Sequence, residues 1–298
     1  MADSMPAHPT IVITGATSGI GRLAAIALAG RGAHIVFTAR DKAKAASTRA
    51  AIKAVAPDAR VDVHYADFAN LGDVAEVARE ISSRYERIDV LINNAGLHAF
   101  EQRVTTDGYA EMIAVNYLAP WLLTNALRSR LIGSAPSRVV NVASRASLRS
   151  GESRPRNDIL DIAPFTSLGS SVIYGRTKLM NIMFSMELAR QLKDTGVRVN
   201  CLCPGFNVTG LGRELSFAKP LEWILKALNI GNPRHGANII VALASDPGFQ
   251  GVTGGYFSAK GAKPLEAPRQ GRDRSAQQAL WSVTSELLIQ HMAAATRA

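Results

Sequence analysis

Cysteine is scarce in this chain of 298 residues, in which only Cys201 and Cys203 occur. At positions i and i+2 of a strand the two side chains point to one face, where a disulfide between them would be strained. The sequence therefore excludes a disulfide scaffold, and we expect two buried thiols in a reducing compartment. We expect no metal site, because no histidine or aspartate stands close to the pair.

Long apolar runs are missing as well. No stretch approaches the ~20 apolar residues that cross a bilayer, and residues 1–9 have neither the basic start nor the apolar centre of a secretory signal. We therefore expect a cytoplasmic protein with no membrane span. With 47% hydrophobic and 19% charged residues, the chain has enough apolar material for a sizeable globular core, which excludes a disordered or collagen-like chain.

Acidic residues are the minority among the charged side chains. Against 34 Lys and Arg stand 24 Asp and Glu, which gives a formal net charge of +10. This balance points to an anionic partner. We expect no nucleic acid, because no zinc-ligand spacing, basic helix with heptads or RNA-binding aromatic motif accompanies the charge. A cofactor that carries phosphate groups would bind some of these basic side chains.

Short β-branched runs alternate with longer helical patterns along most of the chain. The expected strands cover 10–14, 33–38, 61–65, 90–92, 138–142 and 197–202, and expected helices begin near Ile20 or cover 71–84, 109–131, 174–193 and 235–245. Parallel strands need long connections, and helices supply them. We therefore predict a single-domain α/β protein with a doubly wound parallel sheet, helices on both faces and a core over 10–205.

Two segments depart from this alternation. Residues 145–172 combine Arg145, Arg149, Arg154 and Arg156 with Gly and Pro, too irregular for a strand and too interrupted for one helix, so we expect a long surface excursion. The extension 261–298 begins polar and then regains an apolar helical pattern, which predicts a docked C-terminal helix whose last residues fray.

A glycine-rich turn follows the first expected strand. The run from Thr14 to Gly21 has the form T-G-x-x-x-G-x-G and leads directly into a helix. Glycines allow a tight turn and a close approach of backbone to pyrophosphate, and the helix N-terminus offers free N–H groups. The placement between strand and helix predicts dinucleotide binding. The residues expected to hold the cofactor here are Gly15, Thr17, Ser18, Gly19, Ile20 and Gly21.

The end of the second strand indicates which dinucleotide is used. A cofactor without a 2′-phosphate usually meets an acidic residue at this place, but here the strand ends in Arg40. A guanidinium pairs with a phosphate, so Arg40 favours NADP over NAD, with Arg22 as a helper. The alternative is a solvated arginine beside Asp41.

Tyr174 and Lys178 stand four residues apart, on one face of an expected helix. A free phenol has a pKa near ~10, and a nearby cation lowers it. The pair could therefore exchange a proton with an alcohol or a carbonyl. In isolation the spacing often arises by chance.

Further motifs stand in the same order along the chain. Besides the glycine turn and the Tyr–Lys pair, these are Asn93-Asn94-Ala95-Gly96, Asn116, Ser144 and Pro204-Gly205. Together they resemble the short-chain dehydrogenase/reductase family over Thr10 to Leu288, which implies a Rossmann fold. The segment from Tyr174 to Glu187 and the ending G-G-Y-F-S look like the retinol dehydrogenase and protochlorophyllide reductase branch.

The resemblance implies roles for four residues. Tyr174 would be the general acid/base, and Lys178 would lower the pKa of Tyr174 and bind the nicotinamide ribose. Ser144 would donate a hydrogen bond to the substrate oxygen, with Ser147 as its rival. Asn116 would hold a water that links Lys178 to solvent, or it would merely cap or pack within its helix.

The resemblance also implies further cofactor contacts. Asp67, with Phe68 beside it, would meet the adenine, and His98 would either face the substrate or be an ordinary loop histidine. Asn93 is expected to be structural. The other expected cofactor residues are Asn94, Ala95 and Gly96 beneath the ribose and Pro204, Gly205 and Thr209 at the carboxamide. Ala143 and Asn207 depart from the family pattern.

The excursion at 145–172 and a lid at 206–230 would flank the substrate cleft with apolar side chains. We therefore expect an NADP-dependent oxidoreductase that interconverts a hydroxyl and a carbonyl on a lipophilic small molecule, and a homodimer that the C-terminal extension could partly block. The alternatives are reduction of an activated C=C bond, and an NADP-binding sensor or scaffold without turnover. The four arginines of the excursion raise an anionic substrate as a further hypothesis, against a solvated basic loop.

Overall fold

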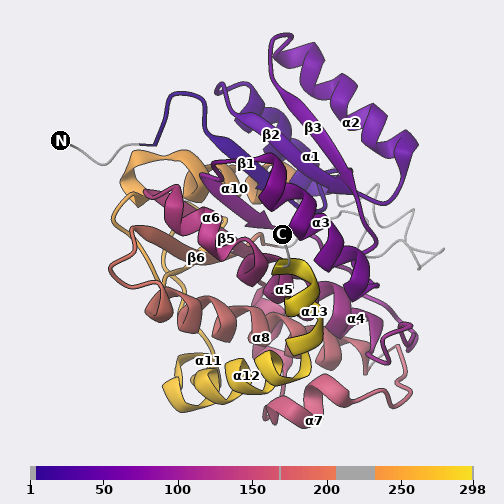
Figure 1. Ribbon diagram of the computed structural model, residues 1–298. Helices are drawn as coiled ribbons and strands as arrows, with labels where there is room; N and C mark the ends of the chain where they lie inside the picture. The colour runs from indigo at the N-terminus through magenta and orange to yellow at the C-terminus, as the bar shows by residue number, and fades with distance from the viewer. Residues whose placement is uncertain (1–4, 168, 206–231, 297–298) are drawn as a thin grey trace.

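A computed structural model describes residues 5–167, 169–205 and 232–296. Within these ranges seven parallel strands form one sheet in the order β3-β2-β1-β4-β5-β6-β7 (Figure 1). The strands are β1 Thr10–Ile13, β2 His34–Ala39, β3 Val61–Tyr65, β4 Val90–Asn93, β5 Ser137–Val142, β6 Val197–Cys203 and β7 Tyr256–Ser258. Each of the first six lies within one residue of its prediction, so the doubly wound parallel sheet is confirmed.

The strand residues alternate between two apolar layers, which explains their nearly continuous hydrophobic runs. Ile11 and Ile13 face one layer, which also contains helices α1 Gly19–Ala29, α2 Lys42–Val55 and α10 Pro233–Ser245. Val12 faces the other layer, with α3 Leu71–Arg84, α5 Ala119–Ala126 and α8 Ser170–Gln191. No helix in the described ranges is long and apolar enough to cross a membrane.

Two elements have little signal in the sequence. Helix α2 is rich in lysine and buries only Ala45, Thr48 and Ile52, so its apolar stripe is thin. The Asp41 carboxylate starts this helix by accepting a hydrogen bond from the Lys44 backbone N–H at 3.0 Å. Strand β7 has three residues, too few to show the alternation of side chains that marks a strand in a sequence, and it is defined by its pairing with β6.

The predicted helix over 109–131 is interrupted. The structure has α4 Glu111–Ile113, a π-helical turn at Ala114–Leu118, α5, and α6 Arg128–Gly133. Pro120 has no backbone N–H and leaves the carbonyl of Asn116, four residues earlier, without its α-helical donor. That carbonyl instead accepts a hydrogen bond from the Asn181 side chain of α8 at 2.9 Å. The interruption therefore joins this helix to α8 at Asn116.

The excursion at 145–172 is partly helical. It contains a 3-10 turn, η2 Arg145–Arg149, and the short helix α7 Pro155–Leu160, and α8 already begins at Ser170. Arg145, Arg149, Arg154 and Arg156 are all exposed. The segment thus lies at the surface as predicted, but its end belongs to the helix that carries Tyr174.

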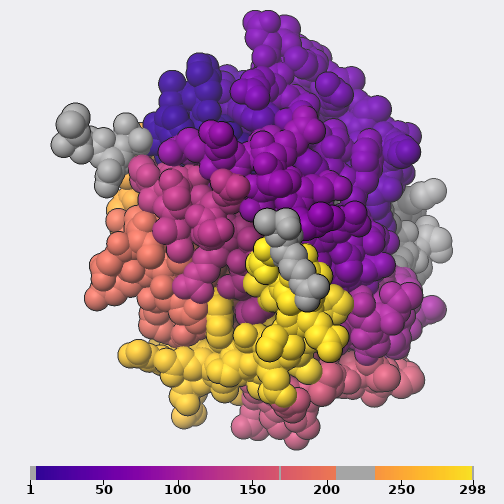
Figure 2. Space-filling view, viewed as in Figure 1, coloured from indigo at the N-terminus to yellow at the C-terminus, as the bar shows by residue number. Residues whose placement is uncertain are grey.

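The C-terminal extension docks as two helices, α12 Arg274–Leu287 and α13 Ile289–Thr296, with the short α11 Arg269–Arg272 before them. Figure 2 shows them spread over the outside of the α3 and α5 side of the molecule. Trp281 of α12 packs 5.3 Å from Trp121 and 5.9 Å from Phe184, measured between ring centroids. The extension thus packs on α5 and α8 through Trp281. Whether it blocks part of a homodimer surface stays a prediction.

Candidate active site

The glycine turn lies at the carboxyl end of β1, where dinucleotides bind in folds of this kind. Gly15 and Gly19 have φ angles of 68° and 55°, which other residues rarely adopt. A Cβ on Gly21 would lie 2.5 Å from the carbonyl oxygen of Gly15 and 2.3 Å from the Asn94 side-chain nitrogen. The turn therefore requires glycine at these positions.

The loop after β4 is fastened to this turn. The Thr14 hydroxyl accepts hydrogen bonds at 3.0 Å from the backbone N–H groups of Asn94 and Ala95. The Asn94 side chain donates to the carbonyls of Thr14 and Gly15 at 3.0 and 3.1 Å. Thr14 and Asn94 thus hold two of the predicted cofactor segments side by side.

The free polar groups of this region fit a dinucleotide. Ser18 stands at the N-cap of α1 but its side chain makes no capping hydrogen bond, so the first N–H groups of the helix are available to an anion. The side-chain oxygen of Asn94 is buried with no hydrogen-bond partner among the described residues. Both features match a bound nucleotide diphosphate and its ribose.

The residues predicted at the adenosine end lie beyond β2 and β3. Arg40 is exposed and has no ion pair among the described residues, because Asp41 is engaged with Lys44. Asp67 is half-buried and accepts a hydrogen bond from the backbone of Ala69. The ring of Phe68 belongs to the apolar core, so only its backbone is placed to meet a nucleotide.

Ser144 and Tyr174 lie together beyond the end of β5. Ser144 caps η2, its Oγ accepting from the Ala146 N–H at 3.1 Å. Burial of the Tyr174 hydroxyl raises the pKa of Tyr174 above its ordinary value, as does Cys203, and a hydrogen bond with Ser144 opposes this rise. At neutral pH the phenol is therefore protonated. Ser147, the rival of Ser144, is buried and its hydroxyl has no partner in the described residues.

Lys178 lies beneath Tyr174, its Nζ 5.5 Å from the centroid of the phenol ring. The Nζ donates a hydrogen bond to the carbonyl of Val142, the last residue of β5, at 3.0 Å. Burial lowers the pKa of Lys178 to about 8. The lowering of the Tyr174 pKa expected from Lys178 is therefore not seen in the chain alone, because desolvation of both groups dominates.

Asn116 joins the loop after β4 to α8. Its side chain accepts from the Leu97 N–H at 2.8 Å and donates to the Leu97 carbonyl at 2.9 Å and to the Thr177 hydroxyl at 3.1 Å. A Cβ on Gly96 would lie 3.2 Å from the Asn116 side-chain oxygen and 3.5 Å from the Lys178 Nζ. The loop thus passes directly over both residues.

Asn93 has the structural place that was predicted for it. Its side-chain nitrogen donates to Thr124 and to Asn141, both at 2.8 Å. These bonds connect β4 with β5 and with α5, beneath the site. Asn93 therefore stabilises the sheet from inside the core.

Glycine 175 allows α8 to approach the end of β5. A Cβ at Gly175 would lie 2.6 Å from the carbonyl oxygen of Ala146, well inside van der Waals contact. The approach brings Tyr174 to Ser144 and Lys178 to Val142. The sequence shows the glycine, but its contact with η2 is seen only in the structure.

The predicted carboxamide contacts lie at the end of β6. Pro204 and Gly205 follow Cys203 directly, and Gly205 has a φ of 77°. Thr209 and Asn207 lie outside the described residues, as does the lid at 206–230.

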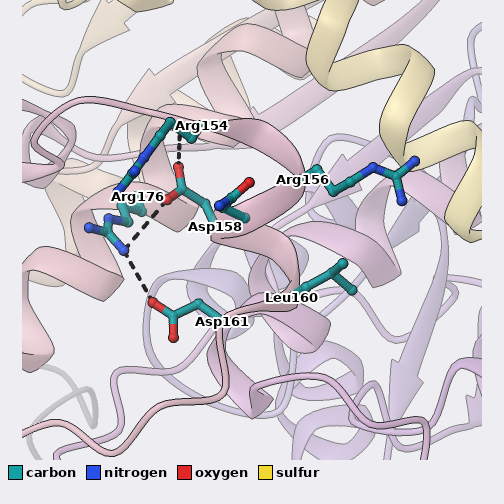
Figure 3. A pocket seen from close by; sticks show the side chains of 7 residues that line it. Arg154, Arg156, Asp158, Leu160, Asp161 and Arg176 are labelled. Atoms are coloured by element: carbon teal, nitrogen blue, oxygen red, sulfur yellow. Dashed lines mark hydrogen bonds and ion pairs between the residues drawn. The ribbon is translucent and has the colours of Figure 1, made fainter.

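The excursion is anchored to α8 by Arg176, two residues after Tyr174. Figure 3 shows Arg176 directed toward Asp158 and Asp161, at 3.5 and 3.6 Å. Arg156 points away and pairs with Glu286 of α12. The hollow between them is lined by charges of both signs, so it does not single out an anion.

Two residues near Tyr174 make contacts that the sequence does not predict. His98 stacks on the Tyr174 ring, with centroids 4.7 Å apart and an interplanar angle of 16°. Cys203 accepts a hydrogen bond from the Arg145 N–H at 3.3 Å, which fixes the backbone after Ser144. The one sequence signal for both is position, since Cys203 ends β6 and His98 lies in the loop after β4.

Comparison with known proteins identifies the family. The short chain dehydrogenase model matches residues 9–155, and the model described as Enoyl-(Acyl carrier protein) reductase matches residues 163–261. Retinol dehydrogenase 14 of Mus musculus is 36% identical over 293 residues, covering 94% of this chain and 85% of its own. Retinol dehydrogenase 13 of Homo sapiens is 32% identical over 289 residues, covering 94% and 84%.

This chain belongs to the short-chain dehydrogenase family. A Mycobacterium Paratuberculosis protein of undescribed activity has a similar structure, with a TM-score of 0.73, 28% identity and coverage of 96% and 95%. A putative NAD(P) dependent gluconate 5-dehydrogenase from Beutenbergia cavernae, solved with NADP, has a TM-score of 0.66, 26% identity and coverage of 86% and 96%. The retinol dehydrogenase-like branch is confirmed, and this short-chain dehydrogenase is an oxidoreductase with a nicotinamide cofactor.

The close approach at Gly175 generates a prediction. We expect Gly175→Ala to push α8 away from η2, lowering the free energy of unfolding by about 1–3 kcal/mol through overpacking and reducing turnover. Gly133→Ala at the exposed end of α6 is the matched control, since a Cβ there meets nothing within 4 Å. Urea denaturation and initial rates measure both variants. Equal stability and equal rates for the two would contradict the role of Gly175.

Proposed function

We propose that this chain is an NADP-dependent oxidoreductase that interconverts a hydroxyl and a carbonyl on a lipophilic small molecule. The observation that supports it most is the placement of Ser144, Tyr174 and Lys178 together at the carboxyl edge of the sheet, beside a turn suited to a dinucleotide. Binding alone would not require a protonated phenol, a hydroxyl and an ammonium at one point.

Each of the three residues has a distinct task in this proposal. The nicotinamide cofactor supplies the hydride, or takes it in the reverse direction. In reduction, Tyr174 transfers its hydroxyl proton to the carbonyl oxygen, and Ser144 stabilises the charge that develops there by donating a hydrogen bond. Lys178 keeps N–H groups beyond the one bound to Val142. These would hold the nicotinamide ribose and, as an ammonium, stabilise the phenolate that Tyr174 leaves behind.

The cofactor would lie along the carboxyl edge, from β2 to β6. Its pyrophosphate would meet Gly15 and the start of α1 from Thr17 to Gly21, and its adenosine would meet Asp67 and the backbone of Phe68. The floor beneath the ribose would be Asn94 to Gly96, and the carboxamide would meet Pro204, Gly205 and Thr209. For Asn116 we propose a positioning role, because its side chain is already bonded to Leu97 and Thr177.

The preference for NADP rests on Arg40. The guanidinium is exposed after β2, free of an ion pair among the described residues, and no carboxylate takes the place where a 2′-hydroxyl would be recognised. Arg22 is a weaker helper, because it already donates to the Ser47 carbonyl at 3.4 Å.

Removal of the Arg40 charge tests this preference. We expect Arg40→Ala to raise the dissociation constant of NADPH roughly 10- to 100-fold, the range for loss of a charge-assisted hydrogen bond, and to leave that of NADH unchanged. Lys53→Ala, at the far end of α2, should change neither. Fluorescence titration with both cofactors measures this. A parallel loss for NADPH and NADH would show that Arg40 does not read the 2′-phosphate.

The substrate class is inferred from the relatives. The relatives are named as retinol dehydrogenases, which act on a long apolar alcohol. The expected lid contributes Leu211, Leu215, Phe217, Trp223, Ile224 and Leu228, which are all apolar. We therefore propose retinal or a lipid aldehyde of similar bulk as the substrate to be reduced.

The Tyr174 hydroxyl is tested by its removal. With all-trans-retinal and NADPH, we expect Tyr174→Phe to lower kcat by roughly 10²- to 10⁴-fold, the usual contribution of a general acid, while NADPH still binds. Tyr65→Phe, on the exposed end of β3, should keep full activity. An enone in the same assay distinguishes C=O from C=C reduction. Full turnover by Tyr174→Phe would refute the proposed mechanism.

A further inference from the structure

A column of three aromatic rings stands beside the catalytic phenol. The His98 imidazole lies between Phe100 and Tyr174, with 4.7 Å between centroids on each side. The interplanar angle is 29° to Phe100 and 16° to Tyr174, so the rings are nearly parallel. His98 and Phe100 come from the loop after β4, whose first residues are the predicted cofactor contacts. The column therefore connects that loop to the ring that carries the acid.

A hydrogen bond fixes the orientation of the imidazole. The Nε2 of His98 lies 3.0 Å from the hydroxyl oxygen of Ser170. Ser170 is buried, and its single proton goes to the carbonyl of Ser167 at 2.6 Å. The hydroxyl oxygen can therefore only accept from His98, so Nε2 carries the proton. Ser170 is the first residue of α8, one turn before Tyr174, so both contacts of His98 lie on one face of that helix.

We propose that His98 is a positioning residue for Tyr174: anchored by Ser170, it holds the phenol ring in the plane from which its hydroxyl reaches Ser144. This inference rests on the proposed function, in which Tyr174 is the acid. The reason is geometric. Tyr174 is not fully buried, and rotation of its ring about the Cα–Cβ bond would carry the hydroxyl away from Ser144. A parallel ring on one face opposes that rotation, and stacked aromatic pairs are stabilising beyond the area they bury.

Three variants separate the stack from the hydrogen bond. His98→Ala removes both, His98→Phe keeps a stacking ring but donates nothing to Ser170, and His235→Ala removes an exposed histidine at the start of α10 as the control. With retinal and NADPH we expect His98→Ala to lower kcat roughly three- to tenfold, the factor expected for one aromatic pair. The dissociation constant of NADPH should stay within about twofold. His98→Phe should recover most of kcat, and His235→Ala should match the wild type.

A measurement without turnover tests the contact itself. In protein with ¹³C-labelled tyrosine, the Tyr174 ring signal, assigned through Tyr174→Phe, should shift in His98→Ala because the ring current of the stacked imidazole is lost. An unchanged ring signal would overturn the proposal, and so would an unchanged kcat in His98→Ala or a kcat that His98→Phe does not recover. Loss of NADPH binding in His98→Ala would also overturn it, because the residue would then support the cofactor loop. A wild-type chain that reduces no carbonyl would refute the proposed function, while the ring signal would still report on the contact.

Discussion

The site depends on the close approach of α8 to the ends of β5 and η2. Two contacts define it: Gly175 against the carbonyl of Ala146, and the Lys178 ammonium bonded to the carbonyl of Val142 at 3.0 Å. A helix displaced by the width of one methyl group would separate Tyr174 from Ser144 and Lys178 from the strand end. Two further contacts hold α8 in place. Asn181 of α8 donates a hydrogen bond to the Asn116 carbonyl in the π turn, and Trp281 of α12 packs on Phe184 of α8. The apolar layer beneath α8 thus fixes the relative positions of Ser144, Tyr174 and Lys178.

This approach also determines the electrostatics. Burial raises the pKa of the Tyr174 phenol and lowers the pKa of Lys178 to about 8, so at pH 7 the phenol is neutral while Lys178 is still mostly an ammonium. A neutral phenol is the form that donates a proton during reduction. The lysine is most useful at the moment when negative charge appears on Tyr174, since the attraction of opposite charges is strong where water is excluded. The desolvation that raises the pKa of Tyr174 therefore keeps the phenol in its acid form.

Much of the fold follows from the sequence, because buried parallel strands have near-continuous apolar runs and glycines mark the turn after β1. The order of the motifs also places Ser144, Tyr174 and Lys178 at one edge. What the sequence does not show depends on contacts between distant segments. Helix α2 has only a thin apolar stripe, and β7 is defined by its pairing with β6. The break at Asn116 arises because Pro120 has no backbone N–H, whereas the apolar periodicity of this segment predicts an unbroken helix. His98 reads as an ordinary loop histidine until the fold brings it against Tyr174.

The central claim is that Tyr174 delivers its proton to the carbonyl oxygen during reduction, and we expect this transfer to occur in the same step in which hydride reaches the carbonyl carbon. Deuterium isotope effects on kcat/KM test this most directly, measured for NADPH deuterated at the transferred position in H₂O and in D₂O. The account predicts that each substitution slows the reaction and that the cofactor effect is not reduced in D₂O, because both transfers share one transition state. The contradicting result would be a rate that falls with deuterated NADPH but not in D₂O, measured in the pH range where the rate does not depend on pH. The proton would then arrive in a separate step.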